Sequence, residues 1–296
     1  MGCVECPRKC NKERVEGDAS SYGYCKVSVL PKVARAALHF WEEPCISGEE
    51  GSGTVFFSGC NLRCVYCQNV EIAAGVRGKE ISVKRLSEIF LELQEKGANN
   101  INLVTPSHYY RQIKEALLLV KEQLHIPVIA NTSSYDSVEV LKEMEGLIDI
   151  YLADYKYADG ALAKKYSHAE DYPQVAAEAL KEMFRQVGEP QFDERDMMKK
   201  GMIIRHLLLP GCKEDSKAVL KFLYETFGDS VYISIMNQYT PLPQVEGYPE
   251  INRWITEEEY EEVVDYAIEL GIENGFIQEG ETADESFIPD FDGEGV

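Results

Sequence analysis

Short runs of β-branched and apolar residues alternate with longer segments of helical period from about residue 54 onward. This alternation is typical of repeated strand-helix units around a parallel sheet. The predicted strands are residues 54–58, 101–105, 127–130, 148–153, 202–208 and 231–236, with a short seventh at 276–278. We therefore expect an α/β chain, interrupted between the fourth and fifth strands by a helical, polar insert at 158–201.

The predicted helices have recognisable ends. The segment from Ser82 to Gly97 has apolar residues at helical spacing, a serine that can cap its start and a glycine that can end it. Thr256 and Glu259 form a capping box for a later helix, which ends at Gly271. Six strand-helix units are fewer than the eight of a complete (β/α)8 barrel, so the prediction is a partial (β/α)6 barrel of the TIM type.

The first 53 residues do not follow this rhythm, because they hold four clustered cysteines, several glycines and one short apolar stretch at 33–40. We expect an N-terminal cysteine-rich module at 1–53 and the barrel at 54–280. An acidic C-terminal segment at 281–296 follows, in which Ile288 and Phe291 offer apolar anchors for packing on or near the barrel.

Composition narrows the choice of partners and location. The net charge of −21 argues against nucleic acid or an anionic membrane, because phosphate binding requires clustered Lys and Arg. No apolar run approaches the roughly 18 residues of a membrane helix. Residues 1–10 are polar and contain no apolar leader, so the expected location is the cytoplasm.

The strongest chemical signal is a C-x3-C-x2-C triad, Cys60, Cys64 and Cys67, directly after the first predicted strand. Nine cysteines without an export signal indicate metal ligands or redox groups rather than disulfides. Three thiolates on one loop can hold three corners of an iron-sulfur cube and leave the fourth iron open. A structural zinc site requires four ligands, and the triad has no fourth Cys or His nearby in the sequence. The sequence therefore predicts a [4Fe-4S] cluster at a strand end, where barrels place their active sites.

At these residues the chain resembles the radical SAM superfamily, and the flanking sequence is similar to its pyruvate formate-lyase activating enzyme-like branch. Tyr66 supplies the aromatic residue before the last cysteine that the superfamily's motif contains. The resemblance implies that the three cysteines bind [4Fe-4S] and that S-adenosylmethionine chelates the fourth iron. Reduction then gives methionine and a 5′-deoxyadenosyl radical. The family fold, a partial (β/α)6 barrel, agrees with the strand count.

Further matches lie at the ends of later strands. Asp154 and Lys156 form a D-x-K segment, and Arg205 begins a segment that ends in Pro-Gly; both are similar to glycyl-radical activating enzymes. Thr105 stands where those enzymes often carry Gly-Gly-Glu-Pro, a departure that weakens the activating-enzyme assignment. Asn131 is polar at the predicted barrel mouth and equally fits a helix N-cap. The charged residues also fit surface ion pairs. The expected cofactor contacts are Tyr66, Thr105, Asn131, Asp154, Lys156 and Arg205.

A second group of thiols has ligand-like spacing: Cys3, Cys6, Cys10 and Cys25. Four thiolates can close a tetrahedral site, so this group fits either a structural zinc or a second iron-sulfur cluster. Unligated, reduced thiols are the alternative. The group resembles the N-terminal cysteines of the same activating-enzyme-like branch, which does not identify its metal.

The expected function is a radical SAM enzyme that abstracts a hydrogen atom from a substrate at the barrel mouth. By resemblance, the leading substrate is the backbone glycine of a glycyl-radical enzyme, and an electron donor such as flavodoxin or ferredoxin reduces the cluster. One alternative is modification of a small molecule or peptide. From a different class, the chain fits a non-catalytic iron-sulfur or zinc carrier or scaffold.

Overall fold

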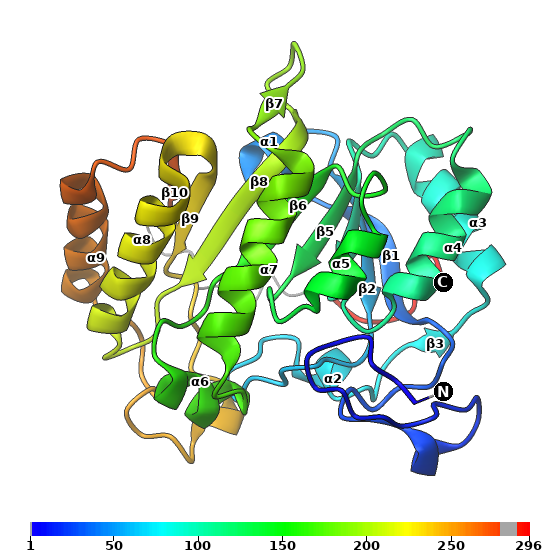
Figure 1. The fold of residues 1–296 in the computed structure, drawn as a ribbon, viewed down its shortest axis with the longest axis horizontal. Coiled ribbons are helices and arrows are strands. Elements are labelled where there is room, and N and C mark those ends of the chain that lie inside the picture. The colour runs from blue at the N-terminus through cyan, green and yellow to red at the C-terminus, as the bar shows by residue number, and fades with distance from the viewer. Residues whose placement is uncertain (1, 279–288) are drawn as a thin grey trace.

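The computed structural model describes residues 2–278 and 289–296, which are organised around one sheet (Figure 1). The strands are β1 Lys32–His39, β2 Ser52–Phe57, β3 Lys79–Glu80, β4 Ile101–Val104, β5 Val128–Thr132, β6 Ile150–Asp154, β7 Gln191–Phe192, β8 Met198–Leu207, β9 Tyr232–Met236 and β10 Gly275–Ile277. The α-helices are α1 Pro44–Ser47, α2 Val70–Ala73, α3 Val83–Glu95, α4 Tyr110–Val120, α5 Val138–Glu143, α6 Gly160–Ser167, α7 Tyr172–Val187, α8 Lys213–Phe227 and α9 Glu257–Leu270. Short 3-10 helices span Ala19–Ser21, Gly228–Ser230 and Pro243–Val245.

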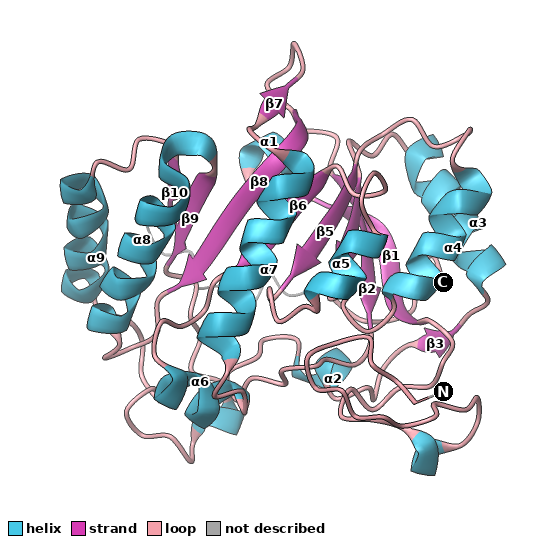
Figure 2. Cartoon of the chain, in the orientation of Figure 1, coloured by secondary structure: helices cyan, strands magenta, loops and turns pink. Residues whose placement is uncertain are grey.

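The sheet runs in the order β10-β9-β8-β6-β5-β4-β2-β1-β3, and β7 pairs only with β8 among the described strands. From β10 to β2, neighbouring strands are parallel and follow one another in chain order. Because crossovers between parallel strands are right-handed, this order places the connecting helices on one face of the sheet (Figure 2). The edges β10 and β3 do not pair with each other. The predicted α/β fold with an open, partial barrel is therefore confirmed.

Local sequence signals set the helix ends as expected. The hydroxyl of Ser82 accepts a hydrogen bond from the backbone N–H of Arg85 (3.0 Å) at the start of α3. Thr256 and Glu259 form both bonds of the capping box at α9, and Gly271 ends that helix at φ 88°. These caps fix where α3 and α9 begin, and their apolar faces then pack on the sheet.

The opposite face of the sheet forms the barrel interior. At one end, α1 inserts Cys45 and Ile46 against interior residues such as Ile150 and Ile203. This apolar plug excludes water from that end of the barrel. The interior positions next to the plug are polar: Asn102, Asn131, Asp154 and Arg205.

Strand β1 lies within the first 53 residues and was not predicted. It pairs antiparallel with β2, so that Ala36 stands opposite Val55. Its sequence, KVARAALH, is rich in alanine, which has low strand propensity. Burial against β2 and the helices outweighs that local preference, since Ala34 and Ala36 are almost inaccessible.

The C-terminal residues that the structure describes also lie along β1. The N–H of Ala36 donates to the carbonyl of Glu294 (2.8 Å), and the Phe291 ring packs on Phe56 with centroids 5.5 Å apart. Ile288, the other expected anchor, lies outside the described residues. The end of the chain therefore contacts the sheet at the strand that precedes β2.

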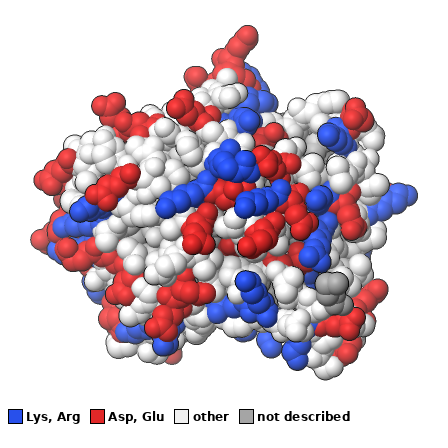
Figure 3. All heavy atoms as spheres, in the orientation of Figure 1, with Lys and Arg blue, Asp and Glu red and all other residues white. Residues whose placement is uncertain are grey.

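None of the helices among the described residues combines the length and apolar composition needed to cross a bilayer. On the face drawn in Figure 3, Lys and Arg side chains stand among Asp and Glu side chains.

Candidate active site

The cysteine triad lies on the loop between β2 and α2, at the carboxyl ends of the parallel strands (Figure 1). Gly59 begins this loop at φ 87°, and a Cβ there would lie 2.6 Å from the carbonyl oxygen of Cys25. Only glycine allows so close an approach. Arg63, between Cys60 and Cys64, has φ 60°, a left-handed conformation that is costly for a side-chain-bearing residue. The loop is therefore held in a specific turn.

All three sulfurs of the triad accept hydrogen bonds. The pairs are Cys60 with the N–H groups of Leu62 and Arg63 (3.4 Å each), Cys64 with the hydroxyl of Ser167 (2.9 Å), and Cys67 with the N–H of Asn69. Such donors favour the thiolate, which is the form that binds metal.

Three remote segments hold the triad loop from outside. These are the N-terminal segment, the end of α6 and the loop after β9. Their hydrogen bonds join Arg8 to the carbonyl of Asn61 (2.8 Å), Val65 to the carbonyl of Tyr166 (2.8 Å) and Gln244 to the carbonyl of Cys67 (2.9 Å). The position of the sulfurs is thus fixed by the tertiary fold before any ligand binds.

A charged group at the ends of β6 and β8 lies next to the triad. The Asp154 carboxylate accepts from Lys156 Nζ (2.7 Å) and from Arg205 Nε (3.1 Å), and all three side chains are less than 20% exposed. Burial opposes the charge of Asp154, but Lys156 and Arg205 outweigh it and hold the pKa of Asp154 below its usual value. All three groups are therefore charged at neutral pH.

Lys156 also acts on the cluster loop. Burial raises the pKa of the Cys64 thiol, and the positive charge of Lys156 opposes that rise. Burial lowers the pKa of Lys156, but the Asp154 carboxylate and Cys64 raise it by more. The pKa of Lys156 is therefore above its usual value. Lys156 is the cation that stabilises negative charge on this side of the triad.

Glu42 completes the charged group and was missed by the sequence analysis. Its carboxylate accepts from Arg205 Nη1 (3.0 Å), Asn102 (2.9 Å) and Asn131 (3.2 Å). Arg205 also donates from Nη2 to Asn131 Oδ1 (2.6 Å). Glu42 lies 163 residues from Arg205 in sequence, within the region assigned to the N-terminal module. The signal that could have found it is the acidic pair Glu42 and Glu43 directly after an apolar run.

The six predicted cofactor contacts are not equally placed. Asn131, Asp154, Lys156 and Arg205 form one connected network. Thr105 is half-buried at the end of β4, where its N–H donates to the carbonyl of Asn131 (2.8 Å). Tyr66 is buried in the triad loop, and its hydroxyl bonds to that of Tyr157 (2.7 Å).

The second predicted thiol group lies against the triad loop. Cys6 and Cys25 are 7% and 6% exposed, and Cys3 and Cys10 are half-buried. Among the described residues, all nine cysteines are free, and no group of three or more His, Cys, Asp or Glu side chains is arranged to hold a single metal ion.

A zinc ion and an iron-sulfur cluster make different demands on the thiols of the triad. Ligands of one zinc ion must converge on a point about 2.3 Å from each sulfur. In an iron-sulfur cube each thiolate binds a different iron, so the sulfurs stand apart. Three half-buried thiols with sulfur-directed donors and a facing cation fit a cube with one open corner.

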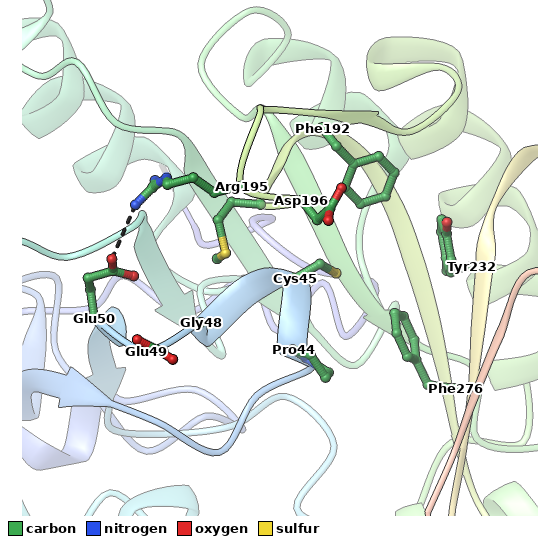
Figure 4. A pocket seen from close by; sticks show the side chains of 11 residues that line it. Pro44, Cys45, Gly48, Glu49, Glu50, Phe192, Arg195, Asp196, Tyr232 and Phe276 are labelled. Atoms are coloured by element: carbon green, nitrogen blue, oxygen red, sulfur yellow. Dashed lines mark hydrogen bonds and ion pairs between the residues drawn. The ribbon is translucent and has the colours of Figure 1, made fainter.

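A cavity of about 660 Å³ lies at the opposite end of the barrel, near the starts of the strands (Figure 4). It is bounded by the α1 segment and the β7–β8 hairpin, which are joined by an ion pair between Glu50 and Arg195 (3.3 Å). The stacked rings of Tyr232 and Phe276, 5.3 Å apart, form another wall. Because barrel enzymes act at the carboxyl ends of their strands, this cavity is not the candidate active site.

Comparison with protein families identifies the central segment. Residues 54–190 match the model of the Radical SAM superfamily. This segment, somewhat less than half of the chain, is therefore similar to radical SAM domains. The matched segment contains the triad, Asp154 and Lys156.

Known proteins resemble more of the chain. The uncharacterized protein MJ0674 of Methanocaldococcus jannaschii is 26% identical over 278 residues, which cover 90% of this chain and 74% of that protein. Two structures of SuiB from Streptococcus suis are similar in fold, each with a TM-score of 0.50 over 75% of this chain. One is bound to the precursor peptide SuiA (16% identity) and one to S-adenosylmethionine (17% identity). The matched region spans only 47% or 48% of the SuiB chains.

Proposed function

We propose that Cys60, Cys64 and Cys67 hold a [4Fe-4S] cluster that binds S-adenosylmethionine at its open corner, and that the chain is a radical SAM enzyme. The observation that carries this proposal is the triad loop itself. Within the segment that is similar to radical SAM domains, it presents three hydrogen-bonded thiols beside the buried cation Lys156. When bound, the two cofactors supply a carbon-centred radical that removes a hydrogen atom from a substrate.

Lys156 is the residue that we propose for binding the cofactor's carboxylate. Its ammonium group has three N–H donors, and among the described residues its one hydrogen-bond acceptor is Asp154. Donors therefore remain for an anion. Asp154 fixes the position of the ammonium group and is itself held by Arg205.

Arg205 has a different role, because its three nitrogens are already engaged by Asp154, Glu42 and Asn131. A guanidinium whose nitrogens all bond to protein side chains holds those side chains in place and does not itself bind a ligand. We propose Arg205 and Asn131 as positioning residues, with Thr105 and Tyr66 as contacts supplied by the neighbouring strand end and the triad loop.

We propose a polypeptide as the substrate. The fold similarity to SuiB, which has been solved with a precursor peptide, supports modification of a peptide residue. The D-x-K segment of Asp154 and Lys156 supports the second candidate, the backbone glycine of a glycyl-radical enzyme. In both cases the hydrogen atom comes from a chain bound at the carboxyl ends of the strands.

The test is anaerobic purification, reconstitution with iron and sulfide, chemical reduction, and measurement of 5′-deoxyadenosine after S-adenosylmethionine is added. Cys64→Ala should lose at least 100-fold of this activity. Cys212→Ala is the matched control, because Cys212 lies outside both thiol groups, and it should keep full activity. Equal activity of Cys64→Ala and the control would overturn the proposal, and so would a fully loaded, reducible protein that never cleaves the cofactor with any peptide present.

The two substrates give different products. With a candidate glycyl-radical enzyme, the product is a protein radical visible by electron paramagnetic resonance. With a candidate precursor peptide, the product is a change of mass in the peptide. In either case 5′-deoxyadenosine should form in proportion to the product.

A further inference from the structure

The four N-terminal thiols form a group that the proposed radical SAM site does not use. The N–H of Cys3 donates to the carbonyl of Lys12 (2.8 Å), which brings Cys3 beside the two residues that follow Cys10. The N–H of Tyr24 donates to Cys10 Sγ (3.4 Å), so the next residue, Cys25, lies at the same place. The fold of this segment thus gathers thiols that are up to 22 positions apart in the printed sequence.

The thiols are close enough to interact electrostatically. Burial raises the pKa of Cys6 to about 12, and Cys25, Cys10 and Cys3 each add to the rise. Four buried or half-buried thiols that repel one another's charge are stable together as neutral groups, or as thiolates around a cation that compensates them.

The hydrogen bonds to sulfur repeat those of the triad. In both groups a cysteine accepts a bond from the N–H two residues later. The pairs are Cys6 with Arg8 and Cys25 with Val27 in the N-terminal group, and Cys60 with Leu62 and Cys67 with Asn69 in the triad. Bonds of this kind stabilise thiolate ligands and tune the clusters that they hold.

The backbone beside these thiols is strained. Lys9, Asn11 and Lys26 have φ 41°, 52° and 61°, and each lies next to Cys10 or Cys25. Such conformations cost on the order of 1 kcal/mol or more each and persist where other interactions impose them. The described part of this segment, up to β1, has only one three-residue 3-10 helix as regular structure. A bound metal group would supply an interaction of this kind.

The local charge suits a negatively charged cluster. Four thiolates around a [4Fe-4S] cube leave a net negative charge, which nearby cations stabilise. Burial raises the pKa of Cys25, and the positive charge of Arg14 opposes that rise more than any other group does. A second cation, Arg8, lies 4.2 Å from the centroid of the Tyr24 ring. Although the chain carries −21, residues 1–40 hold seven Lys or Arg and four Asp or Glu.

We propose that Cys3, Cys6, Cys10 and Cys25 hold a second [4Fe-4S] cluster, with one thiolate on each iron. The backbone donors to sulfur and the nearby cations favour a charged cluster, and a single zinc ion is the alternative that the metal count below tests. Because all four corners are closed, this cluster does not bind S-adenosylmethionine. It lies directly against the first, since Tyr24 donates to the carbonyl of Leu62 in the triad loop (3.0 Å).

The test is a metal count in anaerobically reconstituted protein, with matched variants. The wild type should hold about eight iron and eight sulfide per chain. The triad variant Cys60→Ala/Cys64→Ala/Cys67→Ala and the N-terminal variant Cys6→Ala/Cys25→Ala should each hold about four. Cys212→Ala should hold about eight. Reduction of the triad variant should give the paramagnetic signal of a [4Fe-4S] cluster.

Wild-type protein with about four iron that the triad variant loses and the N-terminal variant keeps overturns the proposal, and so does protein with one zinc that the N-terminal variant loses. Retention of eight iron by the N-terminal variant also overturns it. This count is independent of the proposed enzymatic function. Loss of all iron from the N-terminal variant, with four retained by the triad variant, would contradict a cluster at the triad and leave the second cluster standing.

Discussion

The two cysteine loops contain similar chemistry but are held in place in different ways. The triad loop follows β2, precedes α2 and is bonded to α6 and to the loop after β9. The N-terminal thiols lie on a segment of turns with strained backbone beside two of the cysteines. The fold positions the first loop, whereas under the proposal above the second loop also needs the cluster that it binds. Cysteine spacing thus indicates ligand chemistry in both loops without showing which of them is preorganised.

The number of thiols adds a second difference. Three ligands would leave one iron corner open, and the barrel interior places Lys156 and its partners beside the triad. Four ligands would close the other group, beside which the described residues form no buried ion network comparable to that of Asp154. Reactivity is therefore expected where the scaffold is rigid and a corner is open.

The largest loss of stability is expected for Glu42→Ala, in the ion network beside the triad loop. The substitution removes the carboxylate that pairs with Arg205 and accepts from Asn102 and Asn131. Since Arg205 retains Asp154, we expect a loss of about 3 kcal/mol of unfolding free energy, at the lower end for a broken buried ion pair. Urea unfolding of the metal-free protein measures this loss.

Two variants separate charge from general disruption. Glu42→Gln keeps the side-chain shape and should lose less stability than Glu42→Ala. Glu49→Ala changes an exposed residue of the same segment and should stay within about 0.5 kcal/mol of wild type. If Glu42→Ala were as stable as Glu49→Ala, the interior network would not support the barrel.

Metal removal should increase trypsin cleavage of the N-terminal cysteine loop much more than cleavage of the triad loop. After chelation, cleavage at Lys12 and Lys26 should accelerate at least tenfold, because both residues are exposed and their segment loses its constraint. Cleavage at Arg63 should change much less, since the fold holds that loop. Mass spectrometry of early fragments assigns the sites. Equal acceleration at Arg63 would show that the triad loop also depends on its metal.

The barrel and the triad were accessible to sequence analysis for physical reasons. Buried parallel strands form apolar runs, and the seven predicted runs all became strands. Because parallel strands end at the same edge of a sheet, polar residues after different strands meet, as Asp154 and Arg205 do at 3.1 Å. The spacing of Cys60, Cys64 and Cys67 predicts their chemistry without a structure.

Other features depend on tertiary contacts that no local pattern contains. The alanines of β1 favour helix, and pairing with β2 makes them a strand. Glu42 reaches Arg205 across 163 residues, because the chain after β1 returns through the barrel interior. Ser167 meets Cys64 only because α6 folds back over the triad loop, a contact across 103 residues.

The support that α6 gives to the triad should depend on pH through Asp215. This carboxylate, in the first turn of α8, accepts from the N–H groups of Ala158 (3.1 Å) and Asp159 (2.7 Å), just before α6. Burial raises its pKa from 3.8 to about 6 despite those bonds. Because the folded state holds the proton more tightly, the contribution of Asp215 is favourable below about pH 4 and is lost as pH rises through 6.

The size of that loss is about 1–2 kcal/mol, allowing for partial solvent screening. Asp215→Asn should remove it, so that the difference in unfolding free energy between variant and wild type grows between pH 4 and 6 and then stays constant. Glu214→Gln, at a neighbouring side chain that is 78% exposed, is the control and should show no such difference. A difference that is independent of pH would contradict the raised pKa.

The smallest effect is expected from the hydrogen bond that Ser167 donates to Cys64 Sγ (2.9 Å). Among the described residues, no side chain donates a similar bond to an N-terminal thiol. Reduction of a cluster at the triad adds negative charge to its sulfurs, and a donor stabilises that state. Ser167→Ala should therefore lower the reduction potential of the triad cluster. A loss of roughly 1 kcal/mol corresponds to on the order of 40 mV for one electron. Redox titration followed by electron paramagnetic resonance measures the shift, with the exposed Ser20→Ala as control. An unchanged potential at unchanged iron content would mean that the Ser167 hydroxyl does not act on the cluster. If two cluster signals are present, a shift confined to one of them would assign that signal to the triad.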